Sequence, residues 1–145
     1  MFPSVRRAAD GDVDRIVTIS ALCFSNPWQR EAFIADIARS WTRLLVVTDS
    51  EHVVGFVHYW LVAGEVQVMN VATDPTHRRR GLGRALVASM LDDARENRCE
   101  TVLLEVRAAN HAAIALYASF GFAQTGVRER YYDDGEDAVL MAARL

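Results

Sequence analysis

Apolar residues recur along this chain in two rhythms, one typical of helices and one typical of strands. Between Val13 and Ser20 they follow helical spacing after the capping sequence Asp10-Gly11-Asp12, which predicts a helix ending near Phe24. After a break at residues 26–28, a second helix is predicted from Gln29 to Arg39. The pattern predicts further helices at Leu82–Asn97 and Asn110–Phe120, and strands at Val5–Ala8, Thr42–Thr48, Val53–Ala63, Val66–Thr73, Thr101–Arg107, Phe122–Tyr131 and Glu136–Ala142.

The order of these elements is β-α-α-β-β-β-α-β-α-β-β. Turns at residues 49–52 and at Gly64 join three strands into an antiparallel meander, and a β-α-β unit follows it. Gly121 is expected to end the last helix in a left-handed cap. The sequence therefore predicts an α+β (mixed α/β) fold with one central, mostly antiparallel sheet. A length of 145 residues predicts a single domain over residues 1–145.

Composition and charge exclude several classes of protein. A net charge of −3, from 16 basic and 19 acidic residues, argues against broad nucleic-acid binding. The longest apolar run, residues 53–63, is interrupted by His58 and is too short to cross a membrane. Two scattered cysteines form neither a disulfide framework nor a metal site, and the histidines lack metal-ligand spacing. We therefore expect a cytoplasmic protein without a metal.

The basic charge is concentrated in one loop, Arg78-Arg79-Arg80-Gly81-Leu82-Gly83-Arg84, which joins a predicted strand to a predicted helix. Glycines let backbone N–H groups approach a ligand closely, and a helix start adds unpaired donors and partial positive charge. Such a loop is typical of an anion site for a phosphorylated cofactor. Taken alone, an ordinary solvent-exposed basic turn explains it equally well.

A glycine-rich loop of this kind can belong to three kinds of cofactor site. A dinucleotide fingerprint is opposed by Leu86, which stands where the third glycine belongs, and by residues 74–80, which separate the strand from Gly81. A P-loop is excluded because no Gly-Lys-Ser/Thr follows. Coenzyme A fits, because its pyrophosphate needs a short loop rich in N–H groups and its pantetheine arm can lie beside a strand.

Arg78-x-x-Gly81-x-Gly83 matches the Q/R-x-x-G-x-G/A pyrophosphate motif of the GNAT acetyltransferase superfamily, which the chain also resembles in element order. Residues 104–108 (Leu-Glu-Val-Arg-Ala), Asn110 and the Ala-Leu-Tyr at 115–117 are more specific. They resemble the bacterial ribosomal-protein-alanine N-acetyltransferases of the RimI type. The resemblance implies transfer of acetyl from acetyl-CoA to the N-terminal α-amine of a protein, an alanine of a small-subunit ribosomal protein.

The resemblance also implies roles for individual residues. Glu105 would be the general base and Tyr117 the general acid. The cofactor would be bound by Val71, Ala72, Thr73, Arg79, Arg80, Gly81, Leu82, Gly83, Arg84 and Asn110. Trp28, Tyr131 and Tyr132 would frame the groove for the acceptor peptide. Without the resemblance, Glu105 is a rim carboxylate paired with Arg107 or another basic residue, Tyr117 is a packed helix tyrosine, and Asn110 is a helix cap.

Other functions remain open on the sequence alone. The acceptor could be a lysine or a small-molecule amine, although a lysine amine has a pKa of ~10.4 against ~7.7–8.0 for an α-amine. The same fold could also serve as a non-catalytic acyl-CoA sensor. Cys23 and Cys99 lie outside the predicted catalytic segments, which favours direct transfer over a route through a cysteine.

Overall fold

Seven strands form one mixed sheet in the computed structural model, which describes residues 3–145. The strand order is β1-β2-β3-β4-β5-β7-β6. Only β4 and β5 pair in parallel, and the other neighbours are antiparallel. The strands are β1 (Ser4–Arg7), β2 (Thr42–Asp49), β3 (His52–Val62), β4 (Glu65–Thr73), β5 (Thr101–Arg107), β6 (Ala123–Arg128) and β7 (Ala138–Arg144). The predicted meander and β-α-β unit are confirmed.

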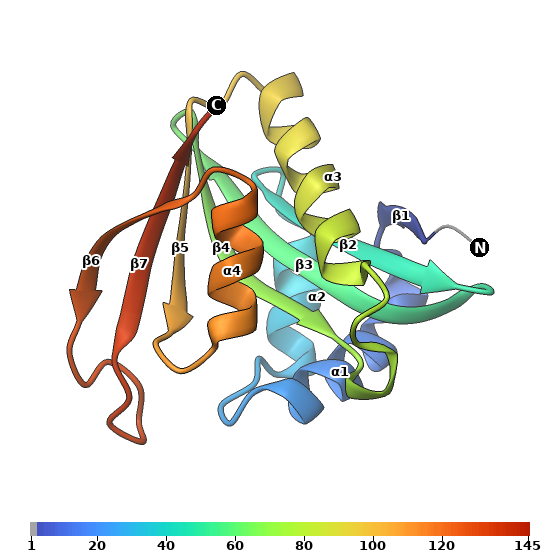
Figure 1. Ribbon diagram of the computed structural model, residues 1–145. Coiled ribbons are helices and arrows are strands. Elements are labelled where there is room, and N and C mark those ends of the chain that lie inside the picture. The colour runs from blue at the N-terminus through green and yellow to red at the C-terminus, as the bar shows by residue number, and fades with distance from the viewer. Residues whose placement is uncertain (1–2) are drawn as a thin grey trace.

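Helices cover both faces of the sheet (Figure 1). On one face lie α1 (Val13–Cys23) and α2 (Arg30–Ile37), and on the other lie α3 (Leu82–Glu96) and α4 (His111–Ser119). Two short 3-10 turns, η1 (Asp10–Asp12) and η2 (Pro75–His77), precede α1 and α3. The sheet is thus the middle of three layers, and each face has its own core.

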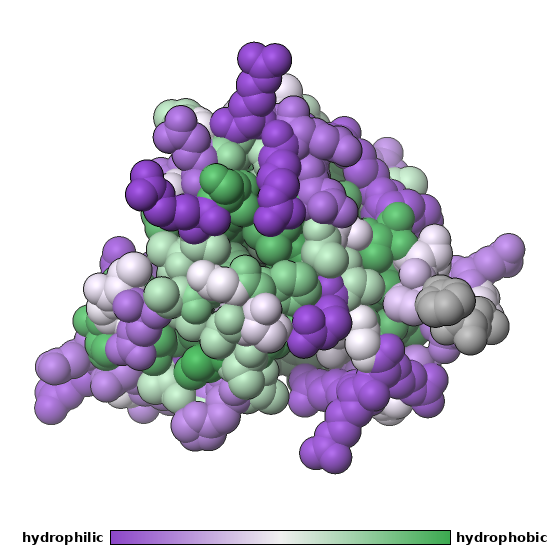
Figure 2. Space-filling model, turned by 45° about the horizontal axis from the view of Figure 1, so that its top comes forward, coloured by the Kyte–Doolittle hydropathy of each residue, from purple (hydrophilic) through white to green (hydrophobic). Residues whose placement is uncertain are grey.

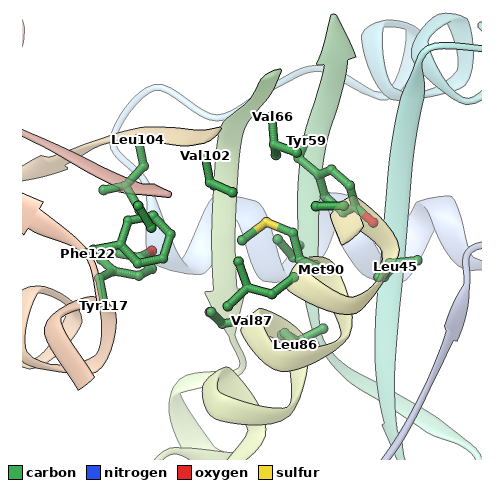
Figure 3. Packing of buried hydrophobic residues seen from close by; sticks show 14 of the residues in the cluster. Leu45, Tyr59, Val66, Leu86, Val87, Met90, Val102, Leu104, Tyr117 and Phe122 are labelled. Carbon is green, nitrogen blue, oxygen red and sulfur yellow. The ribbon is translucent and has the colours of Figure 1, made fainter. Parts of the chain in front are cut away.

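The core under α3 and α4 is the larger one. Figure 3 shows Leu86, Val87 and Met90 of α3 against the sheet, and Tyr117 and Phe122 beside Leu104. The core under α1 and α2 is built from side chains such as Ile16, Phe33 and Phe56. On the face seen in Figure 2, long hydrophilic side chains project at the periphery, and apolar or weakly polar residues cover the middle.

The C-terminal hairpin differs from its predicted boundaries. Its strands were expected at 122–131 and 136–142, but β6 already ends at Arg128 and β7 begins only at Ala138. The loop between them (residues 129–137, the β6–β7 loop) has its own hydrogen bonds, from the Arg130 N–H to Asp137 Oδ1 at 3.0 Å and from the Tyr132 N–H to the Glu136 carbonyl at 3.1 Å. Polar side chains that satisfy backbone groups compete with ladder pairing.

Asp74, directly after β4, anchors the segment that leads into the basic loop. Its Oδ1 accepts hydrogen bonds from the backbone N–H of Thr76 at 3.0 Å and from the Thr76 hydroxyl at 2.8 Å. Its Oδ2 binds the guanidinium of Arg15 on α1, which also donates to the Val53 carbonyl at 2.9 Å. The hydrogen bonds from Thr76, together with Arg15, lower the pKa of Asp74 to about 2. The carboxylate thus ties the end of β4 to α1.

Asp74→Ala is expected to lower the free energy of unfolding by about 1–3 kcal/mol, because a cap and a charge-assisted hydrogen bond are lost. Since the folded pKa is depressed, the stabilisation is complete above the unfolded value of ~3.9 and disappears as the pH falls through about 2. Urea unfolding of the native protein and of Asp74→Ala between pH 6 and pH 2 measures the difference in their free energies of unfolding. Asp92→Ala, which removes an exposed ion pair with Arg95, is the control and should change little.

Candidate active site

Strands β4 and β5 separate after a short parallel ladder. It begins at the pair Glu65 and Thr101 and ends at the pair Gln67 and Leu103. Just beyond, β4 carries a bulge, because Met69 has no partner on β3 between the paired residues Val68 and Asn70. A bulge bends a strand and increases its twist. The two strands therefore diverge, as Figure 1 shows, and the sheet opens in its middle.

A cleft of about 770 Å³ occupies this opening, a size typical of small-molecule sites. Its wall comes from β4 and β5, the α1–α2 loop (residues 24–29), α4, and the β6–β7 hairpin. The cleft brings together seven residues singled out in the sequence: Trp28, Val71, Glu105, Asn110, Tyr117, Tyr131 and Tyr132. It does not reach Ala72 and Thr73, the last two residues of β4, or residues 79–84, which follow that strand.

Glu105 projects from β5 toward the α1–α2 side of the sheet. Its neighbours Leu104 and Val106 are buried in the core under α3 and α4, and side chains alternate along a strand. Glu105 Oε1 lies 3.7 Å from the Arg128 Nε, so the basic partner is Arg128 and not Arg107. A hydrogen bond with Glu105 raises the pKa of Tyr131. With its side chain 33% exposed, Glu105 can accept a proton and exchange it with water.

Tyr117 lines the same cleft from the opposite side of the sheet. It comes from α4, is only 6% exposed, and its ring centroid lies 5.7 Å from that of Phe122. Burial raises the pKa of Tyr117 to about 12, with a smaller contribution from Tyr132. The hydroxyl is therefore protonated throughout the neutral range and can donate a hydrogen bond into the cleft.

Arg107, at the end of β5, fastens two loops that frame the cleft. Its Nη1 donates to Asp134 Oδ2 at 2.8 Å and to Glu136 Oε1 at 2.9 Å, both in the β6–β7 loop. Its Nη2 donates to Ser25 Oγ in the α1–α2 loop at 3.2 Å. The guanidinium also lies over the Tyr132 ring, 4.1 Å from its centroid. This role has no local signal in the sequence, because all four partners are distant along the chain.

The three aromatic residues expected at the acceptor groove do lie on the cleft wall. Trp28 stands edge-on to the buried His58, with ring centroids 4.6 Å apart. Tyr131 and Tyr132 are packed edge to face at 5.2 Å, and Tyr131 is 46% exposed. Two aromatic walls thus face the cleft from loops on either side.

The glycine loop has the backbone geometry of an anion site. Gly81 has a φ of +76° and is the N-cap residue of α3, and the first bond of the helix runs from the Ala85 N–H to the Gly81 carbonyl at 3.0 Å. The N–H groups of Leu82, Gly83 and Arg84 therefore have no helical partner. The Leu82 side chain is buried in the core, so only its backbone can contact a ligand.

The arginines of this loop differ in what they contact. Arg80 lies 3.7 Å from Asp49, and the Arg84 Nη2 donates to Ser119 Oγ at 3.1 Å. Arg78 lies 3.7 Å from the Cys23 sulfur. Arg79 is exposed and has a φ of +65°. Within residues 3–145 its side chain forms no hydrogen bond or ion pair, so of the four it is free to bind an anion.

Two expectations for smaller features can be checked in the structure. Asn110 is the N-cap of α4, as predicted, since its Oδ1 accepts from the Ala113 N–H at 3.1 Å. Cys23 was expected away from the catalytic segments, but it lines the cleft, where its sulfur donates to the Thr73 carbonyl at 3.3 Å. The sequence could not show this contact, because it joins α1 to the end of β4.

Within residues 3–145, no group of three or more His, Cys, Asp and Glu side chains is arranged to hold a metal ion. No helix in that part of the chain is long and apolar enough to cross a membrane.

Comparisons of sequence and of structure with known proteins both find acetyltransferases. Residues 13–122 match the acetyltransferase (GNAT) family. The chain is 37% identical over 119 residues to the ribosomal protein bS18-alanine N-acetyltransferase of Escherichia coli strain K12, covering 80% of each chain. It is 34% identical over 137 residues to N-alpha-acetyltransferase RimI of Mycobacterium tuberculosis, covering 90% of this chain and 85% of that protein.

The crystal structure of the ribosomal-protein-S18-alanine N-acetyltransferase from Escherichia coli has a TM-score of 0.90 with this chain, at 32% identity. The match covers 99% of this chain and 94% of the other. The expected mixed α/β fold of the GNAT type is thereby confirmed. The chain belongs to the GNAT acetyltransferase family, among the RimI-type ribosomal-protein-alanine N-acetyltransferases, and is an N-acetyltransferase.

Proposed function

We propose that this enzyme transfers the acetyl group of acetyl-CoA to the N-terminal α-amine of a protein, an alanine of a small-subunit ribosomal protein. The observation that carries the proposal is the opening between β4 and β5, where Glu105 and Tyr117 line one cleft from opposite sides of the sheet. Relatives named for their action on the alanine of bS18 support this acceptor. Two free thiols, Cys23 and Cys99, agree with a reducing cytoplasm as the compartment.

Coenzyme A fits this chain at two places. Its pyrophosphate suits the free N–H groups at the start of α3, where a Cβ added to Gly81 would meet no atom within 4 Å and Arg79 supplies a nearby positive charge. Its amide-bearing pantetheine arm suits the backbone of residues 71–73, since β4 has no ladder partner on the β5 side beyond Gln67. Asn110, which lines the cleft beside α4, would contact the same arm.

Gly83→Val is expected to weaken coenzyme A binding by about tenfold or more, equivalent to about 1.4 kcal/mol. A side chain at this position would crowd the free N–H groups and would meet Leu116 Cδ2, which lies 3.2 Å from an ideal Cβ. Isothermal titration calorimetry with coenzyme A measures the change. Gly11→Val, in η1 with no atom within 4 Å of its Cβ, is the matched control. Equal binding by Gly83→Val and the native protein would remove the loop from the cofactor site.

Acetyl-CoA supplies an acetyl thioester, whose C–S bond breaks as the amine nitrogen forms a C–N bond to the carbonyl carbon. The amine must be neutral to attack, and an α-amine with a pKa of ~7.7–8.0 is already partly neutral near pH 7. Glu105 accepts the proton that the amine nitrogen loses, directly or through a water. Tyr117 donates its O–H to the sulfur as negative charge builds up there, and coenzyme A leaves as the thiol.

The acceptor peptide enters between the two aromatic walls of the cleft. Trp28 lies on the α1–α2 loop, and Tyr131 and Tyr132 lie on the β6–β7 loop. Arg107 holds both loops to the end of β5, so the walls keep a fixed separation. Their rings offer apolar area with a polar edge, which suits an extended peptide whose amine must reach Glu105.

A thiol-release assay with acetyl-CoA tests the proposed function. Two acceptors are compared, a short peptide with a free N-terminal alanine and the same peptide blocked at its N-terminus but carrying a lysine. We expect release with the first acceptor only. Release with the lysine peptide alone would keep the cofactor and overturn the acceptor. No release with either, despite binding of acetyl-CoA, would favour a small-molecule amine or a sensor.

A further inference from the structure

Asn70, a residue of the cleft wall, has a buried amide nitrogen without a partner in the described part of the chain. Asn70 follows the bulge of β4 and lines the cleft, and its Nδ2 is buried with no hydrogen bond to any of residues 3–145. Leaving such a donor unpaired costs about 1–3 kcal/mol, and folded proteins keep few of them. Asn70 is a residue of the binding-cleft wall, which points to a ligand atom as the partner of this nitrogen.

Asn70 and Glu105 project to the same side of the sheet from the two strands that border the opening. Along β4, Val71 packs against the α3–α4 core and Ala72 against the α1–α2 core, so Asn70 faces the α1–α2 side with Ala72. Glu105 faces that side from β5, as shown above. Tyr117 lies on the other side, where the start of α3 would hold coenzyme A. The α1–α2 side is therefore the acceptor side.

The two residues also lie at nearly the same height along their strands. The parallel ladder stops at Gln67 and Leu103. Counted onward from that pair, Glu105 is two residues along β5 and Asn70 is three residues along β4, of which one is the bulged Met69. An amine whose proton goes to Glu105 thus has the Asn70 amide across the opening.

A hydrogen bond to the neighbouring His58 would not use up the donor capacity of Asn70. It pairs with Asn70 across β3 and β4, and its Nδ1 is also buried without a partner in the described part of the chain. Its Nε2 lies 2.6 Å from Asp36 Oδ2, and burial lowers the pKa of the imidazole, so Nδ1 is an acceptor. The Asn70 amide carries two N–H groups. Even with one directed to His58, the second is left for a ligand.

We propose that the Asn70 amide donates a hydrogen bond to the carbonyl oxygen of the first residue of the acceptor and so selects N-terminal α-amines over lysine side chains. An α-amine has a carbonyl group two bonds away, whereas a lysine amine is followed by four methylenes and offers no acceptor there. The inference rests on the proposed function and assigns Asn70 as a specificity-determining residue of that site.

A double-mutant cycle, with one change in the enzyme and one in the substrate, tests the hydrogen bond between Asn70 and the first carbonyl oxygen of the acceptor. Native enzyme and Asn70→Ala are compared on an N-terminal alanine peptide and on an analogue whose first peptide bond is an (E)-alkene, which keeps the shape but has no carbonyl oxygen. We expect Asn70→Ala to lower kcat/KM about tenfold for the peptide and less than about twofold for the alkene. For an N-terminally blocked lysine peptide, kcat/KM should also change less than about twofold on Asn70→Ala. The selectivity of the enzyme for α-amines over lysine amines therefore falls about tenfold.

Equal losses on the peptide and the alkene would overturn the inference, because a structural role of Asn70 lowers both rates alike. Asn70→Leu, which fills the site without polar atoms, should reproduce Asn70→Ala if the contact is lost, and urea unfolding checks that both variants fold. Gln124→Ala, which removes an exposed amide of β6 outside the cleft lining, is the matched control. If the native enzyme does not acetylate the alanine peptide at all, the proposed function itself fails, which separates the two outcomes.

Discussion

Glu105→Gln is expected to lower kcat by about 10²–10⁴-fold at neutral pH, the range that a general base contributes. Glutamine keeps the size and most of the shape of the side chain but cannot accept the proton that the amine loses. Binding of coenzyme A should be unchanged, because Glu105 faces the acceptor side of the sheet and not the start of α3. Steady-state kinetics with an alanine peptide, together with calorimetry for coenzyme A, measure the two effects separately.

The control for this change is Glu129→Gln. Glu129 is an exposed carboxylate in the nearby β6–β7 loop and does not line the cleft, so its loss removes one negative charge without touching the site. A further check is the pH profile. If Glu105 is the base, raising the pH should partly restore the variant, since more of the amine is then neutral before it binds. A variant with the native kcat at pH 7 would remove Glu105 from the mechanism.

Tyr117→Phe is expected to lower kcat about 10²-fold or more, with little change in the unfolding midpoint, because the ring that packs on Phe122 is retained. The acid must be protonated to act. With a pKa of about 12 in the folded protein, Tyr117 stays protonated up to that value, so its contribution is lost only as the pH rises toward 12. The native profile should therefore rise through the α-amine pKa of ~7.7–8.0 and stay level to about pH 10.

Kinetics of both proteins between pH 6 and pH 10 test this account. A native profile that falls with a midpoint below pH 10, and loses that fall in Tyr117→Phe, would show that Tyr117 ionises far more easily than its burial implies. Unchanged turnover of Tyr117→Phe at saturating substrates would exclude the proton-donor role. The expected result is a slower variant whose profile, like the native one, rises through the α-amine pKa of ~7.7–8.0 and then stays level to about pH 10.

Local patterns predicted the elements of this fold well because each element has its own signal. The meander, the parallel β4–β5 pair and the cap at Asn110 are confirmed. Gly121 has a φ of +92°, as its expected left-handed cap requires. The boundaries of β6 and β7 were wrong, since Asp137 and the backbone of Glu136 are bonded within their own loop. The place of β7 between β5 and β6 carries no local signal at all.

The site was predictable only in part, for a similar reason. Glu105 and Tyr117 were assigned through the resemblance to the RimI-type family, and the cleft brings them together. The opening itself depends on the bulge at Met69. No residue type in β4 predicts a bulge at this position. Asn70 and Arg107 were missed as site residues because their importance comes from partners across the sheet and across two loops. Such contacts exist only after the chain has folded.

The location of the transferred acetyl group is the most direct test of the proposed acceptor. A single peptide with a free N-terminal alanine and an internal lysine is incubated with the enzyme and acetyl-CoA, and the product is sequenced by tandem mass spectrometry. Both amines then compete for the same cleft under identical conditions. We predict acetylation on the alanine nitrogen alone. Acetyl on the lysine side chain, with the N-terminus left free, would contradict the account of the cleft.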